Sequence, residues 1–299
     1  MKRGRLFKLV IGALILIVLI LAGAIAYYEF TGGWKKFDEE FYLAPAPAEP
    51  FSYARYARPL SQHVDGNGMV NYAALSQNRS DLDTFTREIA GLAREEFDGW
   101  SDEAKLAFWI NAYNALTLKV IVDNYPIQPG LVTGHAYPDN SIRQIPGVWT
   151  KIQFLVLGRR MTLDHMEHKI IRIQFDEPRI HMALVCAAVS CPPLRNEPYA
   201  AQTLNEQLDD QARRFLTSPA NFHVDSSAGE VQLSSILSWF GKDFVGRHKP
   251  ESGFADRSEA ESAVLNFIGS YMAAGDAAYL RTGQYTLEYV DYNWSLNEQ

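Results

Sequence analysis

The sequence lacks the features that mark many common classes of enzyme and of nucleic-acid-binding protein. Its 299 residues contain no glycine-rich phosphate-binding loop and no HExxH zinc signature. The formal net charge is -7, and no block of Lys and Arg follows the N-terminus, so nothing attracts a phosphate backbone. No internal repeat is visible. We therefore expect no cofactor, no metal and no nucleic-acid partner.

Charge is also missing from residues 9–28. In a helix with a rise of roughly 1.5 Å per residue, this segment spans about 30 Å, the thickness of a bilayer's hydrocarbon core. Residues 1–8 are basic, which favours a cytoplasmic N-terminus, and Tyr27, Tyr28 and Trp34 suit the far interface. We expect one transmembrane helix in the inner membrane, with the remainder in the periplasm or outside the cell.

A cleavable signal peptide is the alternative interpretation of this segment. Ala24 and Ala26 would form an acceptable small-residue cleavage site. However, the apolar run exceeds the roughly 7 to 15 residues of a signal core. The length therefore favours an anchor that stays uncleaved, and either interpretation exports the domain.

A tether is expected at residues 29–50, because the Pro-rich and Ala-rich stretch 44–50 cannot join a helix or a sheet. Residues 51–299 form one globular domain, in which 102–124 is the most apolar helix. Apolar spacing and turn residues predict further helices and several strands. The predicted helices are 52–61, 81–94, 162–173, 201–217, 235–239 and 257–273, and the predicted strands are 151–157, 180–187, 221–224, 231–233 and 285–292. The pattern indicates an α+β domain with a central apolar helix and a small, mostly antiparallel sheet.

Cysteine is scarce, since Cys186 and Cys191 are the only two. An exported domain favours a disulfide between them. A fully extended chain would hold them about 17 Å apart, beyond the roughly 7 Å limit, so pairing requires the intervening residues to fold back. Two buried free thiols are a second possibility. The third is a nucleophile, because enzymes often place reactive groups in the loop after a strand.

A cysteine nucleophile needs a histidine to accept its proton. The flanking segments supply four, His135, His165, His168 and His181. On a regular strand, positions five apart face opposite sides, so His181 is expected to point away from Cys186. We therefore predict His168 as the partner, with Glu167 nearby.

Two other sets of polar residues have both a structural and a functional interpretation. His165 and His168 are three apart on a predicted helix, so they could form a metal site with His181 or Glu167, although surface histidines fit the spacing better. Asn111 and Asn114 share one face of the apolar helix. Their amides could orient a substrate, but the more general expectation is that they hold loop backbone.

Four segments together resemble the bacterial domain-of-unknown-function 547 family. They are residues 108–116 (FWINAYNAL), 162–172, 181–194 (which contains CAAVSCPPL) and 292–297. The resemblance extends from about Asp65 to the C-terminus and implies a shared fold, while the family supplies no accepted reaction or substrate. The family usually has an aspartate at the position of Asn293, so no carboxylate role is expected there.

The sequence thus leads to two hypotheses for function. The first is a membrane-anchored hydrolase or acyl-transfer enzyme built around Cys186 or Cys191 with His168, His181 and Glu167 as further candidates, and with Asn111 and Asn114 as candidate substrate-binding residues. The second is a non-catalytic envelope module in which the two cysteines form a structural pair.

Overall fold

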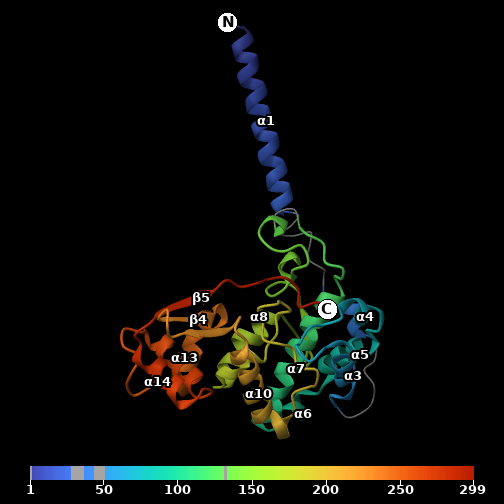
Figure 1. Cartoon of the computed structure of the whole chain (residues 1–299). Helices are drawn as coiled ribbons and strands as arrows, with labels where there is room; N and C mark the ends of the chain where they lie inside the picture. The colour runs from blue at the N-terminus through green and yellow to red at the C-terminus, as the bar shows by residue number, and fades with distance from the viewer. Residues whose placement is uncertain (1, 28–36, 44–50, 131–132) are drawn as a thin grey trace.

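The computed structural model describes residues 2–27, 37–43, 51–130 and 133–299. Helix α1 (Lys2–Tyr27) projects from the rest of the molecule in Figure 1, and side chains 11–24 are exposed. No helix in the described part of the chain is both long enough and apolar enough to cross a membrane. Of the predicted tether at 29–50, residues 29–36 and the Pro-rich stretch 44–50 lie outside the described residues, as does Tyr28, while 37–43 contain the short helix α2 (Glu39–Leu43).

The domain after α1 combines helices with two small sheets, which confirms the predicted α+β class. Its longer helices are α3 (Ala54–His63), α5 (Ser80–Gly91), α7 (Asp102–Val122), α10 (Leu204–Thr217), α13 (Glu259–Gly269) and α14 (Ala274–Thr282). Shorter ones are α2 (Glu39–Leu43), α4 (Tyr72–Gln77), α6 (Arg94–Asp98), α11 (Ser235–Trp239) and α12 (Val245–His248). Most predicted helices are therefore present, with ends that shift by a few residues.

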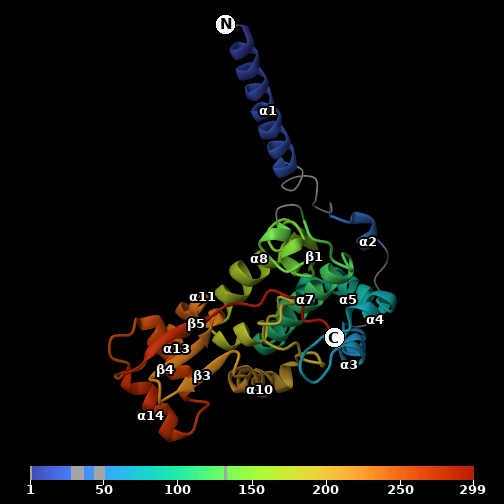
Figure 2. The same cartoon turned by 45° about the horizontal axis from the view of Figure 1, so that its top comes forward.

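Helix α7 is the centre of the larger hydrophobic core. Ser101 caps its first turn, and every residue from Leu106 to Val122 is buried. A helix that is apolar on all sides is stable only inside a protein, and Figure 2 shows α7 within the domain. The predicted central helix is confirmed.

The strands are short and form two separate sheets. β1 (Phe154–Val156) and β2 (Arg159–Met161) make a hairpin. β3 (Phe222–Asp225) pairs with β4 (Glu230–Ser234) antiparallel, and β4 pairs with β5 (Thr286–Val290) parallel. The prediction of a single sheet is therefore wrong. The β1–β2 and β3–β4 pairings are antiparallel as predicted, and β5, a strand late in the chain, adds to β4 in parallel.

The predicted strand at 180–187 is wrong. Pro178 occupies the first turn of a 3-10 helix, η5 (Pro178–Met182), and Glu177 accepts a hydrogen bond from the Arg179 N–H. Proline favours the first turn of a helix, because the backbone N–H groups there have no partner within the helix and the N–H that proline lacks is therefore not needed. The segment is buried as predicted, but burial alone does not distinguish a strand from a tight helix.

The predicted helix at 162–173 is present, but its middle is wider than an α-helix. Thr162 caps it through the His165 N–H, and α8 (Leu163–His165) leads into the π-helical segment η4 (Met166–Ile171). Because a π-helix bonds each residue to the fifth one along, it rotates the following side chains to a different face. His165 and His168 therefore line different pockets, and the predicted shared face is wrong.

The C-terminal segment joins two hydrophobic cores, one around α7 and one around β4 and α13. Tyr292 packs against both. Figure 1 shows the chain running from β5 to the C-terminus beside α4. The Val189 N–H donates to the Ser295 carbonyl at 2.8 Å, and the Tyr72 hydroxyl donates to the Asn297 side chain at 2.8 Å. These bonds hold the last residues across the region between the cores.

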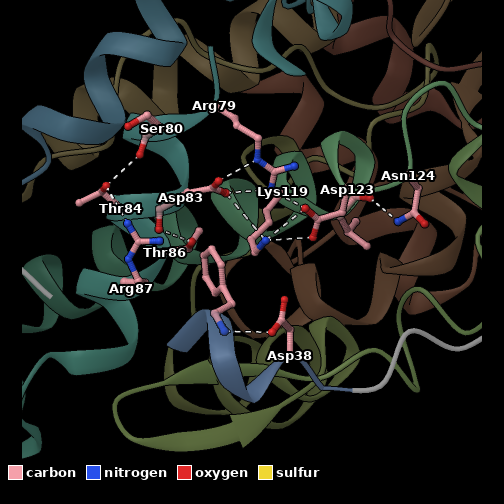
Figure 3. Close-up of polar contacts among 12 residues, drawn as sticks. Asp38, Arg79, Ser80, Asp83, Thr84, Thr86, Arg87, Lys119, Asp123 and Asn124 are labelled. Carbon is pink, nitrogen blue, oxygen red and sulfur yellow. Dashed lines mark hydrogen bonds and ion pairs between the residues drawn. The ribbon is translucent and has the colours of Figure 1, made fainter. Parts of the chain in front are cut away.

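A network of charged side chains joins α5 to α7 next to α2 (Figure 3). The buried Lys119 Nζ donates to Asp123 at 2.9 Å and lies 3.8 Å from Asp83. Its ammonium is 4.0 Å from the ring centroid of Phe41 in α2. Burial opposes ionisation of Asp123, but Lys119 and Arg79 outweigh it and lower the pKa of that carboxyl below its ordinary value.

Candidate functional site

A pocket of about 340 Å³ lies where the two cores meet. It brings together all five side chains that the sequence suggested as catalytic candidates, Cys186, Cys191, Glu167, His168 and His181. Aromatic rings supply most of the remaining wall, including Trp149, Trp239, Phe240, Tyr292 and Trp294. The volume suits a small organic molecule.

The loop that carries the cysteines folds back on itself. Asn114 of α7 donates to the Ala183 carbonyl at 2.9 Å and accepts from the Val185 N–H at 2.9 Å, so it fixes the chain just before Cys186. Ala187 then adopts a positive φ of 59°, a turn conformation that non-glycine residues adopt less often. The Cys191 N–H closes the turn by donating to the Ala188 carbonyl at 3.0 Å.

This turn brings the two thiols into contact. Both cysteines are free, and their Sγ atoms lie 2.7 Å apart. The Cys186 backbone N–H also donates to Cys191 Sγ at 2.8 Å, while the Tyr292 hydroxyl lies 3.1 Å from Cys186 Sγ. The required folding back of the intervening residues is confirmed, and a Cys186–Cys191 disulfide is not present in this structure.

The contacts of the two sulfur atoms shift the pKa values of the two thiols in opposite directions. Burial disfavours the Cys191 thiolate, but hydrogen bonds from the Cys186 thiol and backbone outweigh it and lower the pKa of Cys191. The hydrogen bond to Cys191, followed by burial, raises the pKa of Cys186 well above its ordinary value. The pair therefore loses its first proton from Cys191, and Cys186 keeps its own as a donor.

The two histidines of the pocket bind an arginine and an aspartate. His181 Nε2 is 2.8 Å from Asp243, and Arg172 binds the same carboxylate through two nitrogens at 2.6 Å and 2.8 Å. Burial lowers the pKa of His181, although the hydrogen bond to Asp243 acts in the opposite direction. Arg172 Nη1 donates to His168 Nδ1 at 2.8 Å, because a guanidinium has no acceptor. The lone pair of His168 Nδ1 is therefore occupied.

Within the described residues, neither histidine forms a hydrogen bond with a cysteine sulfur. His181 nevertheless lines the same pocket as Cys186, so the expectation that it points away from the cysteines is wrong. That expectation assumed a regular strand from His181 to Cys186, whereas His181 lies in the 3-10 helix η5. Glu167 accepts a hydrogen bond from the Tyr113 hydroxyl at 3.1 Å and lies within the pocket wall.

The remaining sequence candidates lie elsewhere. Asn111 brackets Tyr199, donating to its carbonyl at 2.8 Å and accepting from its N–H at 2.9 Å, as Asn114 does for its own loop. Both amides are buried and neither lines the pocket. His135 and His165 are exposed outside it. In the part of the chain that the structure describes, no group of three or more His, Cys, Asp or Glu side chains is placed to hold a metal ion.

Sequence reasoning missed several residues of the pocket. Arg143 comes from a long polar loop whose path no pattern predicted. Asp243, which binds His181 from outside the pocket wall, follows α11 in the short helix η7 (Gly241–Phe244). Tyr292 and Trp294 could have been found, because the segment 292–297 carried part of the family resemblance. Their place beside the cysteines depended on the C-terminal segment crossing between the cores.

Comparison with known proteins gives one match. Residues 97–216 match the model of a family described as "Protein of unknown function, DUF547". The matched region contains α7, the cysteine loop and the histidines, while Tyr292 and Trp294 lie beyond it. No curated protein and no solved structure matches the chain. The match supports the resemblance to the domain-of-unknown-function 547 family over this part of the chain, and bacterial origin and membrane anchoring stay predictions.

Proposed function

We propose that the domain is a thiol-disulfide oxidoreductase acting on a small molecule, with Cys186 and Cys191 as its redox pair. The observation that carries the proposal is the 2.7 Å contact between two free thiols in the wall of a pocket. A second thiol within reach is what distinguishes a redox pair from a single nucleophile. The lowered pKa of Cys191 supplies the thiolate that such exchange requires.

The exchange proceeds in two displacements. The Cys191 thiolate attacks one sulfur of a substrate disulfide, forming a mixed disulfide and releasing the first substrate thiolate. Cys186 then attacks Cys191 Sγ, which forms the Cys186–Cys191 bond and releases the second thiolate. Two electrons pass from the dithiol to the substrate, and the two protons of the dithiol pass through solvent to the two released thiolates. The reverse sequence oxidises two substrate thiols.

A Cys/His hydrolase or acyl-transfer enzyme has less support from the geometry. Such an enzyme needs a base within hydrogen-bond reach of the nucleophile. Arg172 occupies His168 Nδ1, and His181 Nε2 binds Asp243. The groups that contact the sulfurs are instead the other thiol, a backbone N–H and a tyrosine hydroxyl.

The test is a redox titration of the purified full chain. The chain is equilibrated in buffers of graded dithiol-to-disulfide ratio, quenched with acid, alkylated and analysed by peptide mass spectrometry. We expect Cys186 and Cys191 to change together between dithiol and internal disulfide, with a midpoint above about -300 mV, the range of exchangeable rather than structural disulfides.

Two other outcomes would reject this function. A pair that stays oxidised at about -300 mV and below is a structural disulfide, as expected of a non-catalytic module. Thiols that are alkylated only after denaturation are inert core residues. Acylation of Cys191 by an activated ester, with no internal disulfide at any potential, would support the acyl-transfer hypothesis instead.

We also propose that α1 attaches the domain to a membrane and that the domain lies on the non-cytoplasmic side. The proposal is supported by the uncharged residues 9–28, the basic residues before them, and the exposed Leu, Ile and Val side chains of the described part of α1. We expect the full chain to remain with membranes after carbonate extraction. Added protease should digest the domain in spheroplasts.

Replacing two of the exposed apolar residues of α1, Ile17→Lys with Leu19→Lys, should release the chain into the soluble fraction. A wild-type chain that carbonate removes is not an integral membrane protein. A domain that protease reaches only after the cells are lysed would reverse the proposed orientation.

A further inference from the structure

One cation of the pocket is held by aromatic rings rather than by an acid. The guanidinium carbon of Arg143, in the short helix η3 (Ile142–Gln144), lies 4.4 Å from the ring centroid of Tyr137, 4.7 Å from that of Trp294 and 5.6 Å from that of Trp149. Such contacts stabilise a cation through the ring quadrupole without neutralising its charge.

The loop that carries Arg143 is itself well fixed. The Ser141 hydroxyl accepts from the Arg143 N–H at 3.1 Å. The buried Gln144 amide donates to the Tyr137 carbonyl at 3.1 Å and to the Pro138 carbonyl at 3.0 Å. The guanidinium thus has a defined position before any ligand binds, which lowers the entropic cost of binding.

Arg143 has hydrogen-bonding capacity to spare. Its Nη2 donates to the Tyr137 hydroxyl, and no carboxylate of the described residues forms an ion pair with it. A guanidinium carries five donors in one plane, and ring faces cannot accept them in that plane. The free donors match a planar oxyanion, which binds arginine through two parallel hydrogen bonds.

We infer that the substrate of this pocket is a small thiol or disulfide bearing a carboxylate, which Arg143 binds while Cys191 attacks the sulfur. The inference rests on the proposed redox function of the cysteines. It is supported by the pocket, because Arg143, Cys186 and Cys191 all line the same space of about 340 Å³. Trp239, 52% exposed and stacked on Trp294 at 17°, adds an apolar surface for the carbon chain.

The remaining charge of the pocket sets the limits of this recognition. Glu167 also lines it and repels an anion, but its carboxylate interacts electrostatically with Arg172 and accepts from Tyr113. The chain as a whole is negative, so long-range attraction does not favour an anionic substrate. A measured preference for anionic over neutral substrates would therefore be due to Arg143.

The experiment compares three disulfides with the reduced full chain: 3,3′-dithiodipropionate, 2-hydroxyethyl disulfide and cystamine, which are anionic, neutral and cationic. Each rate is divided by the rate with dithiothreitol, which corrects for intrinsic reactivity. We expect wild type to favour the anionic probe over the neutral one by at least ~10-fold, as for a charge-assisted hydrogen bond. Arg143→Gln should remove the preference for the anionic probe, while Arg143→Lys should keep part of it.

The matched control is Arg213→Gln, which removes an exposed arginine that also lies over a ring, 5.2 Å from Tyr271, outside the pocket. It should retain the full preference. Equal corrected rates for all three probes in wild type would overturn the inference while leaving the redox function in place.

A second readout does not depend on exchange. Benzoate titration should quench the tryptophan fluorescence of wild type and of Arg213→Gln but not of Arg143→Gln. Quenching without any exchange would mean that the redox function fails and the anion subsite stands. Exchange without quenching or preference would mean that the redox function stands and the proposed anion subsite fails.

Discussion

Cys191→Ser is expected to slow the reaction of the folded chain with a neutral disulfide at pH 7 by at least ~10-fold. The reason is that the substitution removes the thiol of lowered pKa, whereas burial still raises the pKa of the remaining thiol, Cys186, when Cys191 is absent. Rates follow the thiolate fraction, partly offset because a thiolate of lower pKa is a weaker nucleophile. The measurement is the second-order rate constant with 2-hydroxyethyl disulfide, followed by mass spectrometry of the product.

Cys186→Ser serves as the matched variant and should fail at a different step. Cys191 should still form a mixed disulfide, but no second thiol would be released, since the resolving sulfur is missing. In Cys186→Ala, which removes the donor altogether, the rate profile should move to higher pH, because no side chain at this position helps to lower the pKa of Cys191. If the two serine variants react equally fast and give the same product, the assignment of distinct roles is wrong.

Lys119→Met is expected to lower the free energy of unfolding by about 3 kcal/mol at neutral pH. The substitution removes a buried cation that binds Asp123 at 2.9 Å and faces Asp83, and breaking a buried pair leaves charge uncompensated. The measurement is urea unfolding of the full chain. Lys105→Met is the control in the same helix, because it lies outside this network and no ion pair of the described residues includes it.

The destabilisation by Lys119→Met should depend on pH. The pKa of Asp123 is lower in the folded chain than its ordinary value of about 3.9, so its stabilising effect is complete above that value. It is lost as the pH falls through the folded pKa. The difference between wild type and Lys119→Met should therefore shrink below about pH 4. A difference that stays constant down to pH 3 would show that packing against Phe41, rather than charge, accounts for the loss.

The sequence predicts the helices of this domain better than its strands. The apolar spacing of 102–124 and 257–273 extends over several turns, so α7 and α13 could be located with small errors at their ends. The apolar run 180–187 is too short for periodicity to separate a strand from a 3-10 helix. The chain here is fixed instead by Asn114, about seventy residues earlier in the sequence. The Asn114 amide binds the backbone carbonyl of Ala183 and the N–H of Val185, groups that in a strand would have bonded to a neighbouring strand.

The site was predictable in its residues but not in its geometry. Both thiols and both histidines could be named from the sequence, and the structure places them around one pocket. Arg172, four residues after His168, was within reach of a local pattern, but Asp243 could not be named, because it meets His181 only through tertiary packing. The same holds for Arg143, which no local pattern marks as different from any other loop arginine.

The placement of Tyr292 has a consequence for biosynthesis. Its hydroxyl contacts Cys186 across 106 positions of sequence, and the segment around it passes over the cysteine loop. A chain emerging from the ribosome therefore presents two closely spaced thiols well before the residue that covers them has been made. During this interval the pair is open to any oxidant or foreign thiol in its surroundings. The last residues of the chain can cover the cysteine loop only after the middle of the chain, which carries both cysteines, has been synthesised.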